Sequence, residues 1–174
     1  MANTFTLIQT IDLSAGGQTS LDFQNITNTY KDLALYYFIR NTGANGGVYV
    51  KLNNSSSGYY NQRLVGSYTT TTPSADAPFT TLLFGVNAPS SAPAGYFSNG
   101  FLYISDYANT SRDKSGWFDS TYEPNASNLG GNGLSQCIGW NWNNTSAINR
   151  ITITSEDAGS NLAQYSYASL YGIS

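Results

Sequence analysis

The chain has 174 residues, and only 10% of them are charged, against roughly 25% in an average soluble protein. Its 7 lysines and arginines are scattered and the net charge is −3, which argues against nucleic-acid binding, because that function needs a basic face to neutralise phosphates. Histidine is absent, which excludes Ser-His-Asp and Cys-His nucleophiles and histidine-ligated metals.

The length fits a single domain spanning 1–174, and no apolar run approaches the roughly 18 residues of a membrane span. Residues 1–4 show no cationic, apolar leader, and the single cysteine, Cys137, excludes an internal disulfide framework. We therefore expect synthesis in a reducing cytoplasm and no membrane partner. Cys137 itself is interpreted as a small core residue beside Ile138.

The N-terminal segment alternates apolar and polar residues, which predicts a half-buried strand. Its inward-facing residues are Phe5, Leu7, Ile11 and Leu13. A second short strand is predicted around Leu21.

Residues 32–53 read as a central β-hairpin. In the first arm Leu33, Leu35, Tyr37 and Ile39 point one way, and Ala34, Tyr36 and Phe38 point the other. A strand that is apolar on both sides needs cover on both faces. The second arm alternates Val48, Val50 and Leu52 with Tyr49 and Lys51, and the Asn- and Gly-rich residues 41–47 supply a reversing loop.

The rest of the chain continues with strands and loops. Further strands are predicted from Tyr59 to Val65 and over 79–86, 97–107, 115–122, 134–142, 147–154 and 164–173. Exposed loops are predicted over 67–78, 87–95 and 123–133, where prolines or glycines interrupt the pattern. No window repeats apolar residues with helical spacing. About 8–11 strands without a helix predict an all-β, antiparallel jelly-roll β-sandwich.

Carboxylates are the remaining acid/base candidates. Asp119 and Glu123 share a parity, but four positions along a strand span ~13 Å, which is too far for a retaining glycosidase pair. Glu156 with Asp157, or Asp106 with Asp113, could supply oxygens to a calcium ion, but neither pair forms a recognisable loop motif. We therefore predict no catalytic residue, no metal site and no cofactor.

Two tryptophans suggest a binding site. Trp140 and Trp142 share a parity, so both rings project from one face about 7 Å apart, with Asn141 and Asn143 beside them. In a sugar-binding protein this arrangement would be a stacking platform with amide hydrogen-bond partners. The alternative, which is the more frequent use of such residues, is that the indoles lie in the core or in a subunit contact.

Tyrosine is abundant, with 14 in the chain, and favours contact surfaces because one end of its ring is apolar and the other is wet. The candidate contact residues are Tyr36, Phe38, Tyr49, Tyr165, Tyr167 and Tyr171. Alternatively, these rings fill a wide sandwich. A sparsely charged, tyrosine-rich surface predicts assembly with a partner or with further copies of the chain.

A series of segments at both ends and in the centre of the chain forms a further pattern. Its residues are Leu7-Ile8, Leu13, Leu21-x-Phe23-x-Asn25-Ile26-x-Asn28-Thr29-Tyr30-Lys31-Asp32-Leu33, Arg40, Lys51-Leu52-Asn53, Leu102-x-Ile104-x-x-Tyr107, Trp142-Asn143-Asn144-Thr145-Ser146-Ala147-Ile148-x-x-Ile151 and Leu170-Tyr171-Gly172-Ile173. In this order the segments resemble a family of small virion proteins of tailed bacteriophages. Thr27 departs from the family pattern, which has proline at that position. The resemblance covers about half of the chain and implies no active-site residues.

This resemblance implies a jelly-roll virion protein that decorates the capsid or contributes to a tail appendage. The expected function is a capsid decoration (cement) protein, a homotrimer bound to the major capsid protein or another virion protein and located on the virion. The alternative is a carbohydrate-binding adhesin of a tail fibre, which would bind a surface glycan through Trp140 and Trp142.

Overall fold

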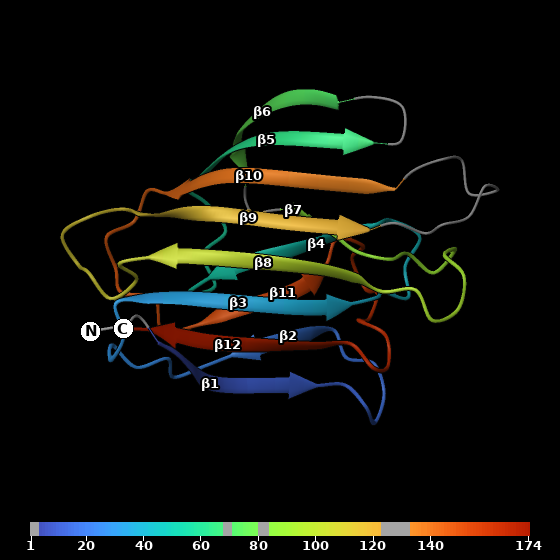
Figure 1. The fold of residues 1–174 in the computed structure, drawn as a ribbon, viewed down its shortest axis with the longest axis horizontal. Coiled ribbons are helices and arrows are strands. Elements are labelled where there is room, and N and C mark those ends of the chain that lie inside the picture. The colour runs from blue at the N-terminus through green and yellow to red at the C-terminus, as the bar shows by residue number, and fades with distance from the viewer. Residues whose placement is uncertain (1–3, 68–70, 80–83, 123–132) are drawn as a thin grey trace.

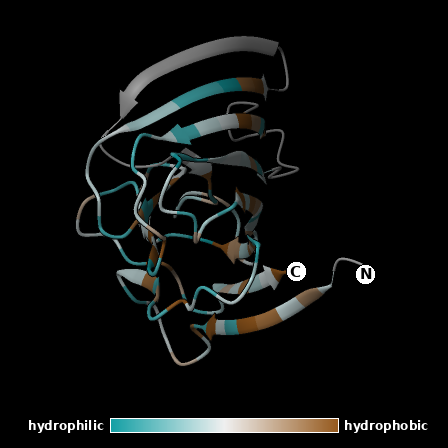
Figure 2. Ribbon diagram, turned by 90° about the vertical axis from the view of Figure 1, so that its left-hand side faces the viewer, coloured by the Kyte–Doolittle hydropathy of each residue, from teal (hydrophilic) through white to brown (hydrophobic). Residues whose placement is uncertain are grey.

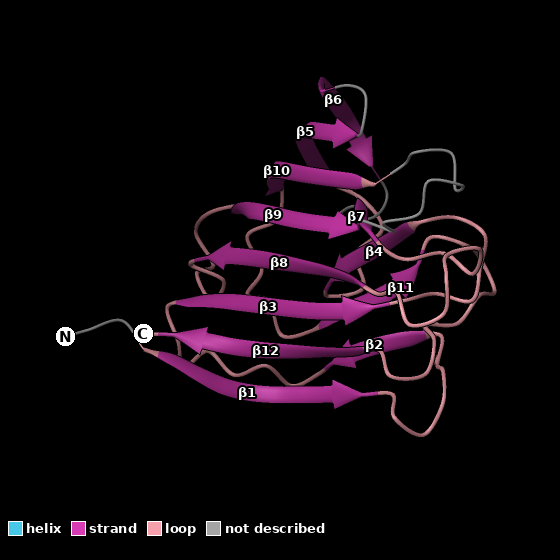
Figure 3. Ribbon diagram, turned by 45° about the vertical axis from the view of Figure 1, so that its right-hand side comes forward, coloured by secondary structure: helices cyan, strands magenta, loops and turns pink. Residues whose placement is uncertain are grey.

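The computed structural model of the protein describes residues 4–67, 71–79, 84–122 and 133–174. These residues form strands and loops without an α-helix (Figure 3). The strands are β1 (Phe5–Asp12), β2 (Ser20–Phe23), β3 (Asp32–Ile39), β4 (Gly47–Leu52), β5 (Tyr59–Ser67), β6 (Thr71–Phe79), β7 (Phe84–Val86), β8 (Ser98–Ser105), β9 (Lys114–Tyr122), β10 (Leu134–Trp142), β11 (Ile151–Ser155) and β12 (Tyr167–Ile173). The described part of the chain contains no helix of the length and apolar character that a membrane crossing requires.

Two antiparallel sheets pack against each other. The large sheet has eight strands in the order β1-β12-β3-β8-β9-β10-β5-β6, and the small sheet has four in the order β2-β11-β4-β7 (Figure 1). Without the hairpins β5-β6 and β9-β10, the sheets read β1-β12-β3-β8 and β2-β11-β4-β7, which is the strand order of a jelly roll. The predicted all-β sandwich is therefore confirmed, and the two hairpins extend one of its sheets.

The predicted central hairpin is wrong. β3 pairs with β12 and β8 in the large sheet, whereas β4 pairs with β11 and β7 in the small sheet. The Asn- and Gly-rich loop therefore crosses from one layer to the other, and its Asn45 amide donates to Asp157 Oδ2 at 2.8 Å. The local sequence specified a reversal of direction, but the two arms lie in different sheets because each buries one face in the same core.

The predicted exposed loop over 67–78 is also wrong, because β6 runs through most of it. β6 lies at the edge of the large sheet and pairs only with β5. Proline is tolerated in an edge strand because its missing N–H leaves no ladder bond unmade on the open side, and Pro73 and Pro78 lie in this strand. Residues 123–132 of the predicted loop and 80–83 of the strand predicted over 79–86 lie outside the described residues, and β7 occupies the end of that predicted strand.

The core lies between the two sheets. Large, fully buried side chains come from the inner face of each sheet: Leu33, Leu35, Leu102, Ile104, Phe118, Ile138 and Leu170 from the large sheet, and Leu21, Phe23, Val48, Val50, Leu52, Ile151 and Ile153 from the small one. The small sheet covers only one face of the large sheet, so the large sheet's other face, here called the outer face, is left uncovered. Figure 2 shows the large sheet from the side, bent along its length rather than flat.

The side chains of β1 switch from one face of the sheet to the other part-way along the strand. Phe5 and Leu7 were predicted to be inward, but both are 54% exposed, whereas Ile8 and Ile11 pack against the core. The register with β12 shifts between Leu7 and Gln9, which marks a β-bulge. One inserted residue reverses the parity of a strand, so Phe5 and Leu7 lie on the outer face while Ile11 keeps the predicted orientation.

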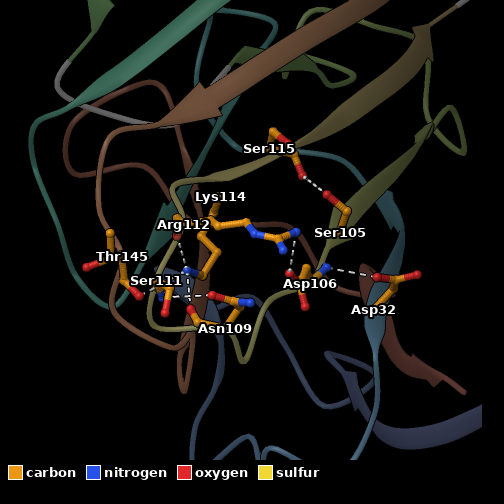
Figure 4. A network of polar contacts seen from close by, with 9 residues as sticks. All are labelled: Asp32, Ser105, Asp106, Asn109, Ser111, Arg112, Lys114, Ser115 and Thr145. Carbon is orange, nitrogen blue, oxygen red and sulfur yellow. Dashed lines mark hydrogen bonds and ion pairs between the residues drawn. The ribbon is translucent and has the colours of Figure 1, made fainter.

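A buried lysine closes one end of the sandwich. Lys114, at the start of β9, is 1% exposed, and its ammonium donates to the backbone carbonyls of Asn109, Arg112 and Thr145 at 2.6, 2.9 and 3.1 Å (Figure 4). Three carbonyl oxygens satisfy the three donors of an ammonium group. Burial nevertheless lowers the pKa of Lys114, with nearby Asp106 opposing that shift. This ammonium joins the turn after β8 to the loop after β10.

Candidate functional site

The outer face of the large sheet carries rows of side chains that run across the strands. One row, set by the strand register, contains Ser169, Tyr36, Phe101, Asp119, Cys137 and Leu64. The next row contains Tyr167, Phe38, Asn99, Thr121, Ser135 and Gly66. The rings lie on β3 and β8 in the first row and on β12 and β3 in the second, while β9 and β10 contribute small or polar side chains to both.

These two rows form a groove of about 660 Å³ in the outer face, here called the outer groove. Rings including Tyr36, Phe38 and Phe101 line one side, and Leu64 of β5 lines the other. Between them Ser135 and Cys137 leave the sheet surface low because their side chains are short. The groove therefore follows from the place where the jelly-roll strands meet the two additional hairpins.

The rings beside the groove are held against one another. Tyr36 and Phe101 have centroids 4.6 Å apart, and Phe38 stacks on Phe97 at 4.8 Å with an interplanar angle of 13°. Tyr167 packs on Phe38 at 5.6 Å. Such ring pairs stabilise one another by about 0.5–1.5 kcal/mol beyond their buried area, so the ring positions are fixed before any partner arrives.

Arg40 positions Phe97. Its guanidinium donates to four carbonyl oxygens of the loop before β8: those of Ser90, Ala92, Pro93 and Tyr96, at 3.1, 2.8, 2.8 and 3.2 Å. A planar group with five N–H donors suits several acceptors at once. The loop is therefore anchored to the end of β3, and the residue that follows it stacks on Phe38.

A second part of the outer face lies outside the groove and is here called the ring patch. It comprises Phe5, Leu7, Tyr171, Tyr103 and Trp117. Tyr103 stacks on Trp117 at 4.1 Å, and Trp117 remains 43% exposed. The Tyr103 hydroxyl donates to Asp32 Oδ2 at 2.7 Å, and burial together with this carboxylate raises its pKa to about 12.

Asp119 gives the groove its charge. Among the described lining residues Asp119 carries a formal negative charge, and no lysine or arginine is present. Its side chain accepts a hydrogen bond from the neighbouring Cys137 thiol, which, with burial, raises the pKa of that thiol. Cys137 is exposed on the outer face, so its predicted core position is wrong; the core side of β10 is taken by Ile138.

The predicted tryptophan platform is not available for stacking. Trp140 and Trp142 share one face of β10, as predicted, but that face is the inner one, where they are 4% and 1% exposed. Trp142 stacks on Tyr59 and donates from Nε1 to the Ser57 carbonyl at 3.2 Å. Of the two amides, Asn141 is half-buried on the outer face and Asn143 is exposed beyond the end of the strand.

Four of the six predicted contact residues do share one surface. Tyr36, Phe38, Tyr167 and Tyr171 lie on the outer face. Tyr49 lies on the outward side of the small sheet, opposite Thr154. Tyr165 is 63% exposed, but it precedes β12 and has a φ of 68°, so it does not continue the Tyr167 row.

Sequence reasoning missed Phe5, Leu7, Phe101, Tyr103 and Trp117. A usable signal was present in β8, where the rings Phe101 and Tyr103 alternate with the aliphatic Leu102 and Ile104. In β3 the outer parity likewise carries the rings Tyr36 and Phe38, but the division is incomplete because Tyr37 lies on the inner parity. The bulge that turns Phe5 and Leu7 outward has no comparable signal.

The candidate metal ligands do not assemble. The described residues hold no group of three His, Cys, Asp or Glu side chains able to bind a metal ion. Asp106 instead lies 3.7 Å from Arg112 Nη1, and Asp157 accepts hydrogen bonds from Asn45. Glu123, the distant partner considered for Asp119, lies outside the described residues.

Comparisons with known proteins give no family. No protein-family model and no curated protein matches the chain. Among solved structures, a double mutant of the alginate lyase Aly36B in complex with alginate tetrasaccharide aligns with 87% of this chain and 78% of its own, at 10% identity and a TM-score of 0.21. A second double mutant of that lyase, in complex with alginate trisaccharide, aligns with 83% and 80%, at 10% identity and a TM-score of 0.20. Likeness this low transfers neither a fold nor an activity.

Proposed function

We propose that this chain is a non-catalytic virion protein that decorates a phage capsid and attaches through the outer face of its large sheet. The observation that supports the proposal most strongly is the set of rings on a face that the second sheet leaves open. A soluble protein rarely exposes a large contiguous apolar surface without a partner for it. The resemblance to small tailed-phage virion proteins supplies the class of partner, the major capsid protein or another virion protein.

The ring patch fits this contact. Phe5 and Leu7 are each 54% exposed and Trp117 is 43% exposed, so apolar area remains to be removed from water. Full burial of such a side chain contributes about 1.5–3 kcal/mol. If the protein binds only the assembled shell, it stabilises that shell by RT ln(1 + [L]/Kd) at every site, where [L] is its free concentration and Kd its dissociation constant.

The test uses heads that lack this protein and the recombinant chain. Trp117→Ala and Leu7→Ser, which alter the ring patch, should each weaken head binding by about tenfold, equivalent to about 1.4 kcal/mol. Tyr165→Ala is the matched control, because Tyr165 is the more exposed ring and precedes β12 rather than lying in a strand of the large sheet. Equal binding by all of these variants, or no binding of the unaltered chain, would contradict the proposal.

We further propose that the attached unit is a homotrimer. Light scattering of the free protein and subunit counting on decorated heads measure this number. A monomer in both states would remove the trimer from the proposal and leave the contact face in place.

A further inference from the structure

The outer groove has a chemical character different from that of the ring patch. One wall of the groove is apolar, with Tyr36, Phe101 and Phe38 on β3 and β8. The part of the groove on β9 and β10 carries hydrogen-bonding groups, with Asp119, Thr121 and Ser135. An occupant must therefore present an apolar surface on one side and hydrogen-bonding groups on the other.

A purely apolar side chain from a protein partner would meet only half of that requirement. It would cover the Asp119 carboxylate and the exposed Asn99 amide, which line the groove, without giving either a partner. Removing a polar group from water without a hydrogen bond is unfavourable, and a charged group is the most unfavourable. Groove and ring patch are thus suited to different ligands.

A pyranose sugar has the required two-sidedness. Its ring carbons carry C–H groups that pack on aromatic faces, and its hydroxyl edge both donates and accepts hydrogen bonds. The Asp119 carboxylate and the Asn99 carbonyl oxygen can accept from sugar hydroxyls, whereas the Asn99 amide group can donate to them. The hydroxyls of Thr121 and Ser135, already 2.9 Å apart, can do either.

The charge of the residues that line the outer groove restricts the class of ligand. The described lining residues contain a carboxylate and no lysine or arginine, so a uronate, sulfate or phosphate in the groove would meet a like charge and no compensating cation. We propose that the outer groove is a binding site for a neutral, pyranose-based glycan and that it rejects anionic polysaccharides. This glycan site lies on the same outer face as the proposed capsid contact. Glycan binding does not depend on capsid attachment.

Cys137 provides a reporter in the groove. It is the chain's single cysteine, it is exposed, and it lines the groove beside Asp119. A bound saccharide should therefore block its alkylation. The rate of reaction with iodoacetamide is measured while cellohexaose, chitohexaose or an alginate-derived hexauronate is titrated.

We expect a neutral hexasaccharide to abolish alkylation saturably and the hexauronate to leave the rate unchanged at the same concentration. Tyr36→Ala should lose the protection, and Ser135→Trp, which fills the groove, should prevent saccharide binding measured by calorimetry. Tyr165→Ala should keep both the protection of Cys137 and the binding of saccharide. Thermal unfolding of each variant verifies that the fold is retained.

Three results would overturn the inference: no neutral probe protects Cys137, the hexauronate protects it equally well, or purified heads protect it while no saccharide does. The third result would assign the groove to the protein contact. Head binding by Trp117→Ala reports on the proposed function separately, because Trp117 does not line the groove. Failure of the glycan site and failure of capsid attachment are thereby distinguished.

Discussion

The two faces of the large sheet are built by the same strands but differ in burial and in residue type. Leu102 and Phe118 on the inner face are fully buried against the small sheet, whereas their chain neighbours Phe101 and Trp117 lie on the open face. Aliphatic side chains dominate inside, and rings that tolerate water dominate outside. Alternation along a strand thus lets one segment supply core side chains on one parity and exposed rings on the other.

The largest expected effect is a difference in the free energy of unfolding between substitutions on the two faces. Phe118→Ala removes a buried ring that packs on Tyr37 at 5.9 Å, and it should lower the free energy of unfolding by about 3–5 kcal/mol. Phe101→Ala, one strand away and on the outer face, should lower it by less than about 1.5 kcal/mol, because its ring contacts are partly solvated. Urea unfolding measures both. Equal losses would mean that the outer face is part of the core.

The next effect concerns Lys114, the charged side chain that is fully buried among the described residues. Lys114→Met keeps the length of the side chain but leaves three carbonyl oxygens without their donor, and it should lower the free energy of unfolding by about 1–3 kcal/mol. Lys31→Met, at an exposed position, should change it by less than about 0.5 kcal/mol. Matching values for the two variants would show that the network in Figure 4 does not stabilise the sandwich.

A smaller effect concerns the outward side of the small sheet, which carries an ion pair between Arg150 and Asp22. Arg150 donates to Asp22 from Nε at 2.8 Å and from Nη2 at 2.6 Å, and this hydrogen bonding lowers the pKa of Asp22 below its ordinary 3.8. A carboxyl with a lowered folded-state pKa contributes stability that is fully present above 3.8 and lost as the pH falls through the folded-state value.

Thermal unfolding of the unaltered chain and of Asp22→Asn between pH 2 and pH 6 measures this contribution, over a window of about two units either side of the ordinary value. The variant should be less stable than the unaltered chain at pH 6, and the difference should shrink as the pH falls below 3.8. A difference that does not change with pH would mean that the Asp22 charge is not responsible.

The smallest effect is a rate rather than a stability. Asp119→Asn removes the negative charge beside the Cys137 thiol, so the raised pKa of that thiol should fall towards its ordinary 9.0. More thiolate is then present at pH 8, and alkylation by iodoacetamide should be faster than in the unaltered chain. An unchanged rate at pH 8 would show that Asp119 does not govern the thiol.

Much of the fold could be predicted because alternation is a local property. The strand 134–142 has the predicted bounds. Tyr36 and Phe38 lie on the face of β3 opposite to that of Leu35 and Tyr37, as predicted. Partner choice is not local, which explains the wrong hairpin: the chain reversal after β3 was visible in the sequence, but its crossing between layers depends on β11 and β12, more than a hundred residues away. β6 was missed because proline is acceptable at an edge that the sequence does not reveal.

The candidate site was predicted only in part, for a related reason. Parity showed that Trp140 and Trp142 share a face, but it could not say which face the small sheet covers. Tyr165 was predicted to lie in a strand over 164–173 because an alternating pattern does not show the positive φ at this residue, which precedes β12. The outer groove depends on β5 lying beside β10, a pairing between segments that are distant in the sequence.

Hydroxyl-radical footprinting of the chain, free and attached to heads, tests most directly whether the outer face is the contact. Oxidation of Trp117 and Phe5 should fall sharply on attachment, while that of Tyr165 should stay unchanged. Undiminished oxidation of Trp117 and Phe5, together with protection of Tyr49 on the small sheet, would contradict the account, because the attached face would then be the opposite one.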